Sequence, residues 1–231
     1  MKAYVITIMD LPASVAAANR CIKSFERTNK HITVEKWRAT TPKDQIYSLF
    51  KNKGIESQYF NENGGSYVKN CMSAFMSHFR LWEQSVILNE TLLILEHDAV
   101  AVNSIPENFD KLYLYGTKQK LHIVNFGHPS YGQFQQPPKM GFQPLVSKGY
   151  FPGAHAYSVS PEGAQSLIEH ATQTAMAGPT DVYLNIQNFP WLQEYYPWPV
   201  EARDNFTTIQ RDVGCRAKHN WSDTYGIIQV P

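Results

Sequence analysis

The sequence predicts an α/β fold, a single domain whose mixed, mostly parallel central sheet is flanked by helices. Three observations support this fold class. The chain has 231 residues, 43% of them hydrophobic, which is enough to bury one sizeable core. Apolar segments of strand length alternate along it with segments whose apolar residues recur at helical spacing. One segment, residues 92–95, is apolar throughout, which is typical of a strand buried on both faces of a parallel sheet.

The first fifty residues predict two strand–helix units. Residues 4–8 form a mostly apolar, β-branched run, and residues 14–27 place apolar side chains on one helical face. Residues 32–37 alternate in the manner of a second strand. Residues 40–44 contain side chains that can cap a helix, which we expect to continue through Phe50.

The middle of the chain contains the longest helical pattern. Residues 54–65 are polar and contain glycine, which predicts a loop. Over residues 66–88 apolar side chains recur with a period near 3.6, which predicts an amphipathic helix packed on the sheet. The buried strand at residues 92–95 comes next, and Glu96, His97 and Asp98 follow it at once.

The second half predicts shorter elements. In chain order we expect a short helix, a strand, a long Pro- and aromatic-rich binding loop or lid, another strand, a helix with a Ser-Pro start, a short helix and a loop-rich tail. These correspond to residues 106–115, 121–126, 130–149, 153–160, 160–170, 180 onward, and 191–231.

Composition excludes several classes of protein. The 21 Lys and Arg residues nearly balance the 20 Asp and Glu residues, so no strong overall charge marks a dedicated nucleic-acid or membrane-surface binder. Three widely spaced cysteines, without a CxxC pair, favour reduced thiols. The first apolar run is too short for a signal peptide, and no segment approaches about 20 apolar residues. We therefore expect a cytoplasmic protein without a membrane anchor.

Acidic side chains directly after the buried strand predict a metal site. Glu96 and Asp98 are two residues apart, which places both carboxylates on one side of an extended chain. One of them can bind Mn²⁺ or Mg²⁺ while the other orients that ion or a nucleotide ribose. His97 points the other way or serves as a nitrogen ligand, which would favour Mn²⁺. A cation held there can neutralise the diphosphate that leaves a nucleotide sugar.

Four ordered segments carry a resemblance to a known family. They are Ser77-His78 with Leu81-Trp82; Leu93 to Ala99; Gly153 with Ala156-Tyr157, Ser160 and Gly163-Ala164; and Pro179 with Asp181. Together they are similar to the motifs of glycosyltransferase family 25, the lipooligosaccharide and collagen-type galactosyltransferases. The resemblance covers most of the chain. It departs from the family's pattern at His97, where the family has an acid.

The resemblance implies a GT-A-like domain that moves a sugar, with inversion, from a nucleotide-diphosphate donor such as UDP-hexose to an acceptor hydroxyl. We expect residues 1–128 to bind the nucleotide sugar and residues 129–231 to bind the acceptor, within one domain. The favoured acceptor is a glycan such as a lipooligosaccharide core. The implied cofactor is Mn²⁺ or Mg²⁺, bound by Asp98, Glu96 and His97.

Inversion by direct displacement requires a base that removes the acceptor's hydroxyl proton. Asp181 is the first candidate for this base and for acceptor binding, and Glu96 is the second. His155 and Tyr157 are further candidates for acceptor binding. Donor contacts are expected from Thr7, Arg20, Ser77, His78, Glu96 and His97.

Other functions stay open on sequence alone. The acceptor could be a hydroxymethylated DNA base, with cationic side chains of the tail on phosphates, although the near-zero net charge favours a glycan. These cations are Arg203, Arg211, Arg216 and Lys218. The chain could also be a noncatalytic nucleotide-sugar- or carbohydrate-binding relative in which His97 ended metal catalysis. A metal-dependent hydrolase is disfavoured because the chain lacks a His-rich ligand set.

Overall fold

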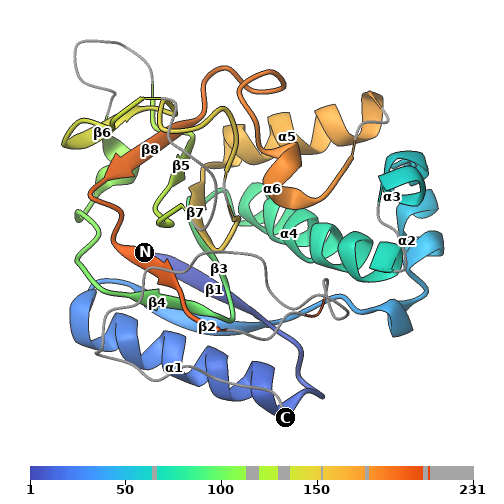
Figure 1. The fold of residues 1–231 in the computed structure, drawn as a ribbon, viewed down its shortest axis with the longest axis horizontal. Helices are drawn as coiled ribbons and strands as arrows, with labels where there is room; N and C mark the ends of the chain where they lie inside the picture. The colour runs from blue at the N-terminus through green and yellow to red at the C-terminus, as the bar shows by residue number, and fades with distance from the viewer. Residues whose placement is uncertain are drawn as a thin grey trace.

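The computed structural model shows one α/β unit built on a seven-stranded mixed sheet, with a second sheet of two strands beside it (Figure 1). The structure describes residues 1–63, 67–112, 120–129, 136–151, 153–174, 177–204 and 208. The predicted fold class is confirmed. The predicted cations at 211, 216 and 218, and residues 130–135 of the predicted lid, lie outside the described residues.

The large sheet has the strand order β2-β1-β3-β7-β5-β8-β6. Its strands are β1 (Lys2–Thr7), β2 (Thr33–Arg38), β3 (Leu92–Glu96), β5 (Ile123–Asn125), β6 (Gly141–Pro144), β7 (Ala156–Val159) and β8 (Gln193–Tyr196). The small sheet pairs β4 (Ala99–Ala101) with β9 (Val200–Ala202). Because β7 opposes β3 and β5, and β6 opposes β8, the other five strands point the same way.

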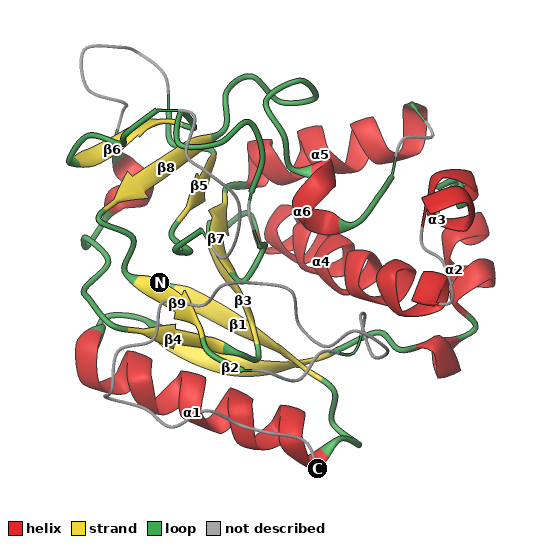
Figure 2. Cartoon of the chain, in the orientation of Figure 1, coloured by secondary structure: helices red, strands yellow, loops and turns green. Residues whose placement is uncertain are grey.

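Helices cover both faces of the large sheet (Figure 2). They are α1 (Pro12–Thr28), α2 (Ile46–Asn52), α3 (Gln58–Asn63), α4 (Val68–Leu88), α5 (Pro161–Gln173) and α6 (Thr180–Tyr183), with 3₁₀ turns at Pro42–Asp44 and Phe109–Lys111. α1 packs on one face with Phe25 and Cys21 in its core. α4 packs on the other with Phe75 and Trp82. The predicted helix over residues 66–88 is therefore confirmed from residue 68 onward.

β3 lies between β1 and β7, and its first four side chains are fully buried. Leu93 and Leu95 belong to the core under α1, whereas Leu92 and Ile94 belong to the core under α4. This alternation is the behaviour of a strand covered on both faces. It confirms the prediction of a central strand at residues 92–95.

Several predicted loops contain regular structure. α3 lies inside the segment 54–65, β6 lies inside 130–149, and β8 and β9 lie in the tail from residue 191. The helix expected over residues 40–50 is a 3₁₀ turn followed by α2, because Gln45 between them takes a left-handed conformation. The missed strands have only three or four residues, so each owes its form to its neighbours in the sheet and not to its own pattern.

The two parts of the chain share one sheet. β7, from the part after residue 128, lies between β3 and β5, which both come from the part before it. Residues 1–128 and 129–231 therefore do not form separate lobes, and their division between donor and acceptor stays a prediction. None of the helices in the described ranges is long and apolar enough to cross a membrane.

α5 begins with the side-chain cap that the sequence predicts. The Ser160 hydroxyl accepts a hydrogen bond from the amide of Gly163 at 3.1 Å, and Pro161 occupies the first turn.

We expect Ser160→Ala to lower the free energy of unfolding by about 1 kcal/mol, measured by urea denaturation, because the amide loses its acceptor. Ser166→Ala, on the exposed side of the same helix, is the matched control. It should be neutral or stabilising, and an equal loss in both variants would contradict the cap.

Candidate active site

The candidate site lies where β3 ends, at the edge where the parallel strands finish and β7 begins. The amide of Glu96 donates to the carbonyl of His155 at 3.0 Å, so residues 59 positions apart in sequence meet here. Such an edge is where open α/β sheets bind ligands. The structure thus brings together two of the predicted site residues.

Glu96 faces α4. Its Oε1 lies 3.3 Å from Nε2 of His78, and its side chain is 37% exposed whereas His78 is buried. Burial acts to raise the pKa of Glu96, but the hydrogen bond with His78 and the nearby His155 and His97 outweigh it, and the pKa lies below its usual value. Glu96 is therefore an ionised carboxylate with one open side.

His97 faces the opposite side of β3. Its Nδ1 lies 3.0 Å from the hydroxyl of Ser14, in the first turn of α1, and this hydroxyl accepts a hydrogen bond from the amide of Ile8 at 2.9 Å. Burial lowers the pKa of His97, which favours the neutral ring. The imidazole therefore ties the turn after β3 to the start of α1 and lies across the strand from Glu96.

Asp98 occupies a turn between β3 and β4. Its Oδ1 is buried and has no hydrogen-bond partner among the described residues. Burial, followed by the negative charges of Glu96 and Asp204, raises the pKa of Asp98 well above its usual value. β3 ends at Glu96, so Asp98 lies in the following turn, close enough for the charge of Glu96 to act on its pKa. The prediction that both carboxylates bind one cation stays a prediction.

An ion pair closes the site on the side of α1. Arg20 binds Asp204 through two hydrogen bonds of 2.7 and 2.8 Å, and the two side chains are 10% and 0% exposed. The amide of Arg203 donates to the carbonyl of Asp98 at 3.1 Å. The predicted donor residue Arg20 is thus used to hold the segment after β9 beside Asp98.

Arg203 is buried beside Glu201, so it does not lie on a surface that could bind DNA phosphates.

Three other predicted site residues are buried in the fold. Thr7 donates its hydroxyl hydrogen bond to the carbonyl of Val5. Ser77 accepts from the amide of Thr40 at 2.9 Å and joins α4 to the segment after β2. Tyr157 is fully buried between β3 and α4. Their burial argues against the direct donor and acceptor contacts that the sequence predicted for them.

His155 is buried against the backbone of Gly127. A Cβ at residue 127 would lie 2.5 Å from Nε2 of His155, so only glycine leaves room for the ring. The backbone contact with Glu96 places His155 next to that residue, just before β7, and its predicted role in acceptor binding stays a prediction.

Asp181 lies half exposed in α6, and the amide of Val182 donates to its Oδ1 at 3.0 Å. The pKa of Cys71 on α4 is raised, first by burial and second by the negative charge of Asp181. The side chains of Asp181 and Cys71 therefore lie near each other. Cys71 and His78 are seven residues apart and share one face of α4, about 10 Å apart along its axis. Cys71 and His78 thus mark two positions on one face of α4, with Asp181 acting on the first and Glu96 hydrogen-bonded to the second.

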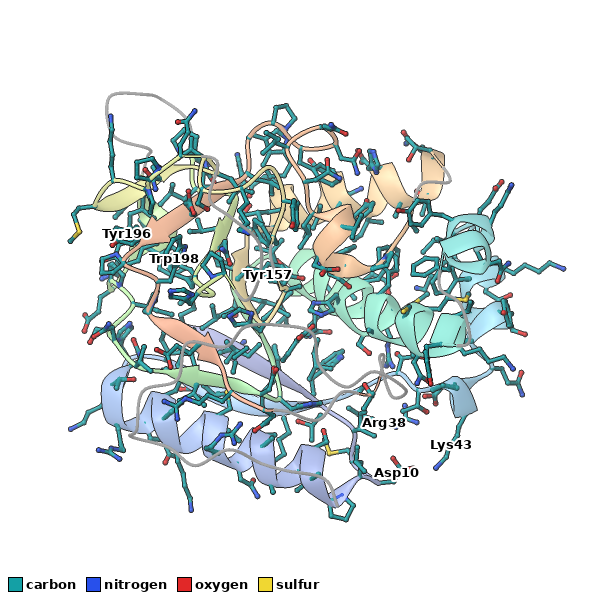
Figure 3. The ribbon with its side chains drawn as sticks, in the orientation of Figure 1. Asp10, Arg38, Lys43, Tyr157, Tyr196 and Trp198 are labelled. Atoms are coloured by element: carbon teal, nitrogen blue, oxygen red, sulfur yellow. The ribbon has the colours of Figure 1, made fainter. Side chains whose placement is uncertain are left out.

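Three charged residues that were not predicted as site residues lie at or beyond the ends of β1 and β2. Figure 3 shows Asp10, Arg38 and Lys43 gathered there. Lys43 pairs with Asp10, and Arg38 donates to Asp44 at 2.6 Å, with both cations largely exposed. In the sequence, Arg38 directly follows the predicted strand at 32–37, whereas Asp10 and Lys43 come two and six residues after the predicted strands.

Comparison with known proteins adds the decisive observation. The family model described as "Glycosyltransferase family 25 (LPS biosynthesis protein)" matches residues 8–184, a span that includes Glu96, His97, Asp98 and Asp181. The chain belongs to glycosyltransferase family 25. No curated protein matches it closely enough to be counted as a relative.

Within this family-25 glycosyltransferase, Glu96 and Asp98 fit a divalent cation. Carboxylate oxygens are the ligands that Mn²⁺ and Mg²⁺ accept, and the buried Oδ1 of Asp98 is an acceptor that no described group satisfies. His97 fits less well, since Ser14 engages its Nδ1. In the described ranges, no three His, Cys, Asp or Glu side chains are already arranged around a common metal position. Glu96 and Asp98 are thus the described side chains that could hold the predicted cation, and its binding stays a prediction.

A separate hollow of about 520 Å³ lies between α2 and α3. Its lining contains Tyr47, Lys51, Glu56 and Asn61, and it includes none of the predicted site residues. The hollow is therefore separate from the candidate site at Glu96 and Asp98.

The electrostatics of Asp98 predict that the site opposes folding when no cation is bound. We expect Asp98→Asn to raise the free energy of unfolding by about 1 kcal/mol in chelator-treated buffer at pH 7, because the amide removes a disfavoured buried charge. Because the pKa of Asp98 is raised in the folded state, the folded protein binds the carboxyl proton of Asp98 more tightly than the unfolded chain does. The carboxylate therefore lowers stability as pH rises above about 4, and the gain should shrink toward that pH.

Chemical denaturation between pH 4 and pH 8 measures this effect. The matched control is Asp110→Asn at an exposed position, which should change stability by less than about 0.5 kcal/mol. A loss of stability in Asp98→Asn at pH 7 would contradict the analysis.

Proposed function

We propose that this glycosyltransferase moves a hexose from UDP-hexose to a hydroxyl of a glycan such as a lipooligosaccharide core, with inversion at the anomeric carbon and with Mn²⁺ or Mg²⁺. One observation carries the proposal. At the end of β3, the buried and unsatisfied Oδ1 of Asp98 lies beside the ionised Glu96, in a chain whose family transfers sugars.

In the proposed reaction, Asp98 and Glu96 would hold the cation, which would supply positive charge to stabilise a leaving diphosphate. His78 donates to Glu96 and keeps that carboxylate in place. His97, which faces Ser14, fixes the turn on which Asp98 is carried. In this proposal these residues orient the donor, and the hydroxyl oxygen of the acceptor is the nucleophile.

Asp181 is the proposed general base. It is half exposed, and the amide of Val182 holds one carboxylate oxygen at 3.0 Å. The separation of about 10 Å along α4 between its neighbour Cys71 and His78 leaves room for one sugar ring between base and cation. There Asp181 would take the proton of the acceptor hydroxyl as that oxygen attacks.

Donor use is the first test. Mass spectrometry of the protein with UDP-sugars and Mn²⁺ should show slow donor hydrolysis, and Asp98→Asn should abolish it. Mn²⁺ should also raise the unfolding temperature of the wild type and leave that of Asp98→Asn nearly unchanged, because the neutral amide lacks the negative charge that attracts the cation. Donor binding without turnover would instead indicate a noncatalytic relative.

Acceptor use separates the remaining choices. An oligosaccharide of the lipooligosaccharide core type should gain the mass of one hexose, whereas hydroxymethylated DNA should not. Transfer to DNA alone would contradict the proposed acceptor. The position of Arg203 inside the fold supports the glycan, since it removes one of the cations predicted to bind phosphates.

The role of Asp181 has its own prediction. We expect Asp181→Asn to lower kcat for transfer by about 10²- to 10⁴-fold while the affinity for donor stays unchanged, because the amide cannot accept the proton. Steady-state kinetics and donor titration measure the two effects. Asp110→Asn is again the matched control, and an equal loss of donor affinity in Asp181→Asn would assign this residue to binding instead.

A further inference from the structure

A line of hydrogen bonds runs from the core under α4 to the open side of Glu96. Nε1 of Trp82 lies 2.8 Å from the hydroxyl of Tyr157, and this hydroxyl lies 2.9 Å from Nδ1 of His78. Nε2 of His78 lies 3.3 Å from Oε1 of Glu96. The first three side chains are at most 1% exposed, so water does not compete for these bonds.

The chemistry of the four groups gives the line a direction. An indole nitrogen can only donate, so the Tyr157 oxygen accepts from Trp82. Tyr157 has one proton, and its only other hydrogen-bond contact among the described residues is Nδ1 of His78. Tyr157 therefore donates to Nδ1, which must be unprotonated. The ring proton of His78 is then on Nε2, where it donates to the carboxylate of Glu96.

We propose that Tyr157 is a positioning residue that fixes the tautomer of His78 and thereby holds Glu96 in its working orientation. Loss of the Tyr157 hydroxyl would leave Glu96 alone to favour the tautomer with its proton on Nε2, so the share of His78 rings with the proton on Nδ1 would rise. In that share His78 presents a lone pair to a carboxylate. That arrangement is repulsive, so Glu96 would move away from His78. This inference rests on the proposed function only for its kinetic consequence, because the tautomer exists without substrate or cation.

Tyr183 and His170 form a second tyrosine–histidine pair, in which the hydrogen bond between hydroxyl and imidazole runs in the opposite direction. This pair provides a control. The Tyr183 hydroxyl donates to the carbonyl of Leu167 at 2.6 Å, so its oxygen is left to accept from Nδ1 of His170 at 3.2 Å. The proton of His170 is therefore on Nδ1. Tyr183 also stacks on Trp82, with ring centroids 5.7 Å apart, and lies in the same core as Tyr157. Removal of either hydroxyl is the same chemical change in the same surroundings.

Nitrogen-15 NMR of the imidazole rings in the full chain, at neutral pH without metal or donor, tests the tautomers directly. The wild type should show His78 with a protonated Nε2 and a bare Nδ1, and His170 with a protonated Nδ1. A proton on Nδ1 of His78, or on both of its nitrogens, would overturn the inference. This measurement requires no variant, so it stands even if a substitution fails to fold.

Variants then test the effect on Glu96. Tyr157→Phe should change the His78 spectrum and lower kcat by roughly 10- to 100-fold, with little change in KM for the donor. Tyr183→Phe should leave the His78 spectrum and kcat within about twofold of the wild type, as expected for a change outside the line. An unchanged His78 spectrum in Tyr157→Phe would overturn the inference. If the tautomers are as stated but no UDP-sugar is used, the proposed function fails and the assignment of the hydrogen bonds remains.

Discussion

The burial of β3 on both faces is the constraint on which the rest of the site depends. A strand covered by α1 on one side and α4 on the other must place successive side chains in opposite cores. When the apolar run ends, the same alternation continues for the next two residues. Glu96 meets His78 of α4, and His97 meets Ser14 of α1. The polar residues are thus directed by the packing of the apolar residues before them.

The same packing places the side chain of Asp204 and Oδ1 of Asp98 in buried positions, where water does not solvate them. Asp204 has its countercharge in Arg20, through a buried two-point contact, whereas Asp98 has no described donor on Oδ1. An acid without a partner in such a place opposes folding and would gain from a cation. A site of this kind exchanges some stability for binding strength, which suits a transferase that must hold a diphosphate.

Long and strongly periodic elements could be predicted from sequence, and short ones could not. α4 and β3 have enough residues for their apolar pattern to be diagnostic. α3, β6, β8 and β9 have three to six residues each, and their form comes from partners distant in the chain. In the same way the position of Glu96 and Asp98 at the end of a strand could be predicted from sequence. The burial of Asp98 and the enclosure of Tyr157 depend on elements that sequence patterns do not place.

By itself the sequence determined the fold class, the central strand and the identity of the residues that follow it, because hydrophobic periodicity and residue order are local properties. The tertiary structure decided which partner each of those residues receives. Tyr157, predicted to touch an acceptor, lies inside the core with its hydroxyl between Trp82 and His78. Arg20, predicted to touch a donor, pairs with an acid 184 positions away. Hydrogen bonds and ion pairs of this kind join residues that only the folded chain brings within reach, and no local pattern contains them.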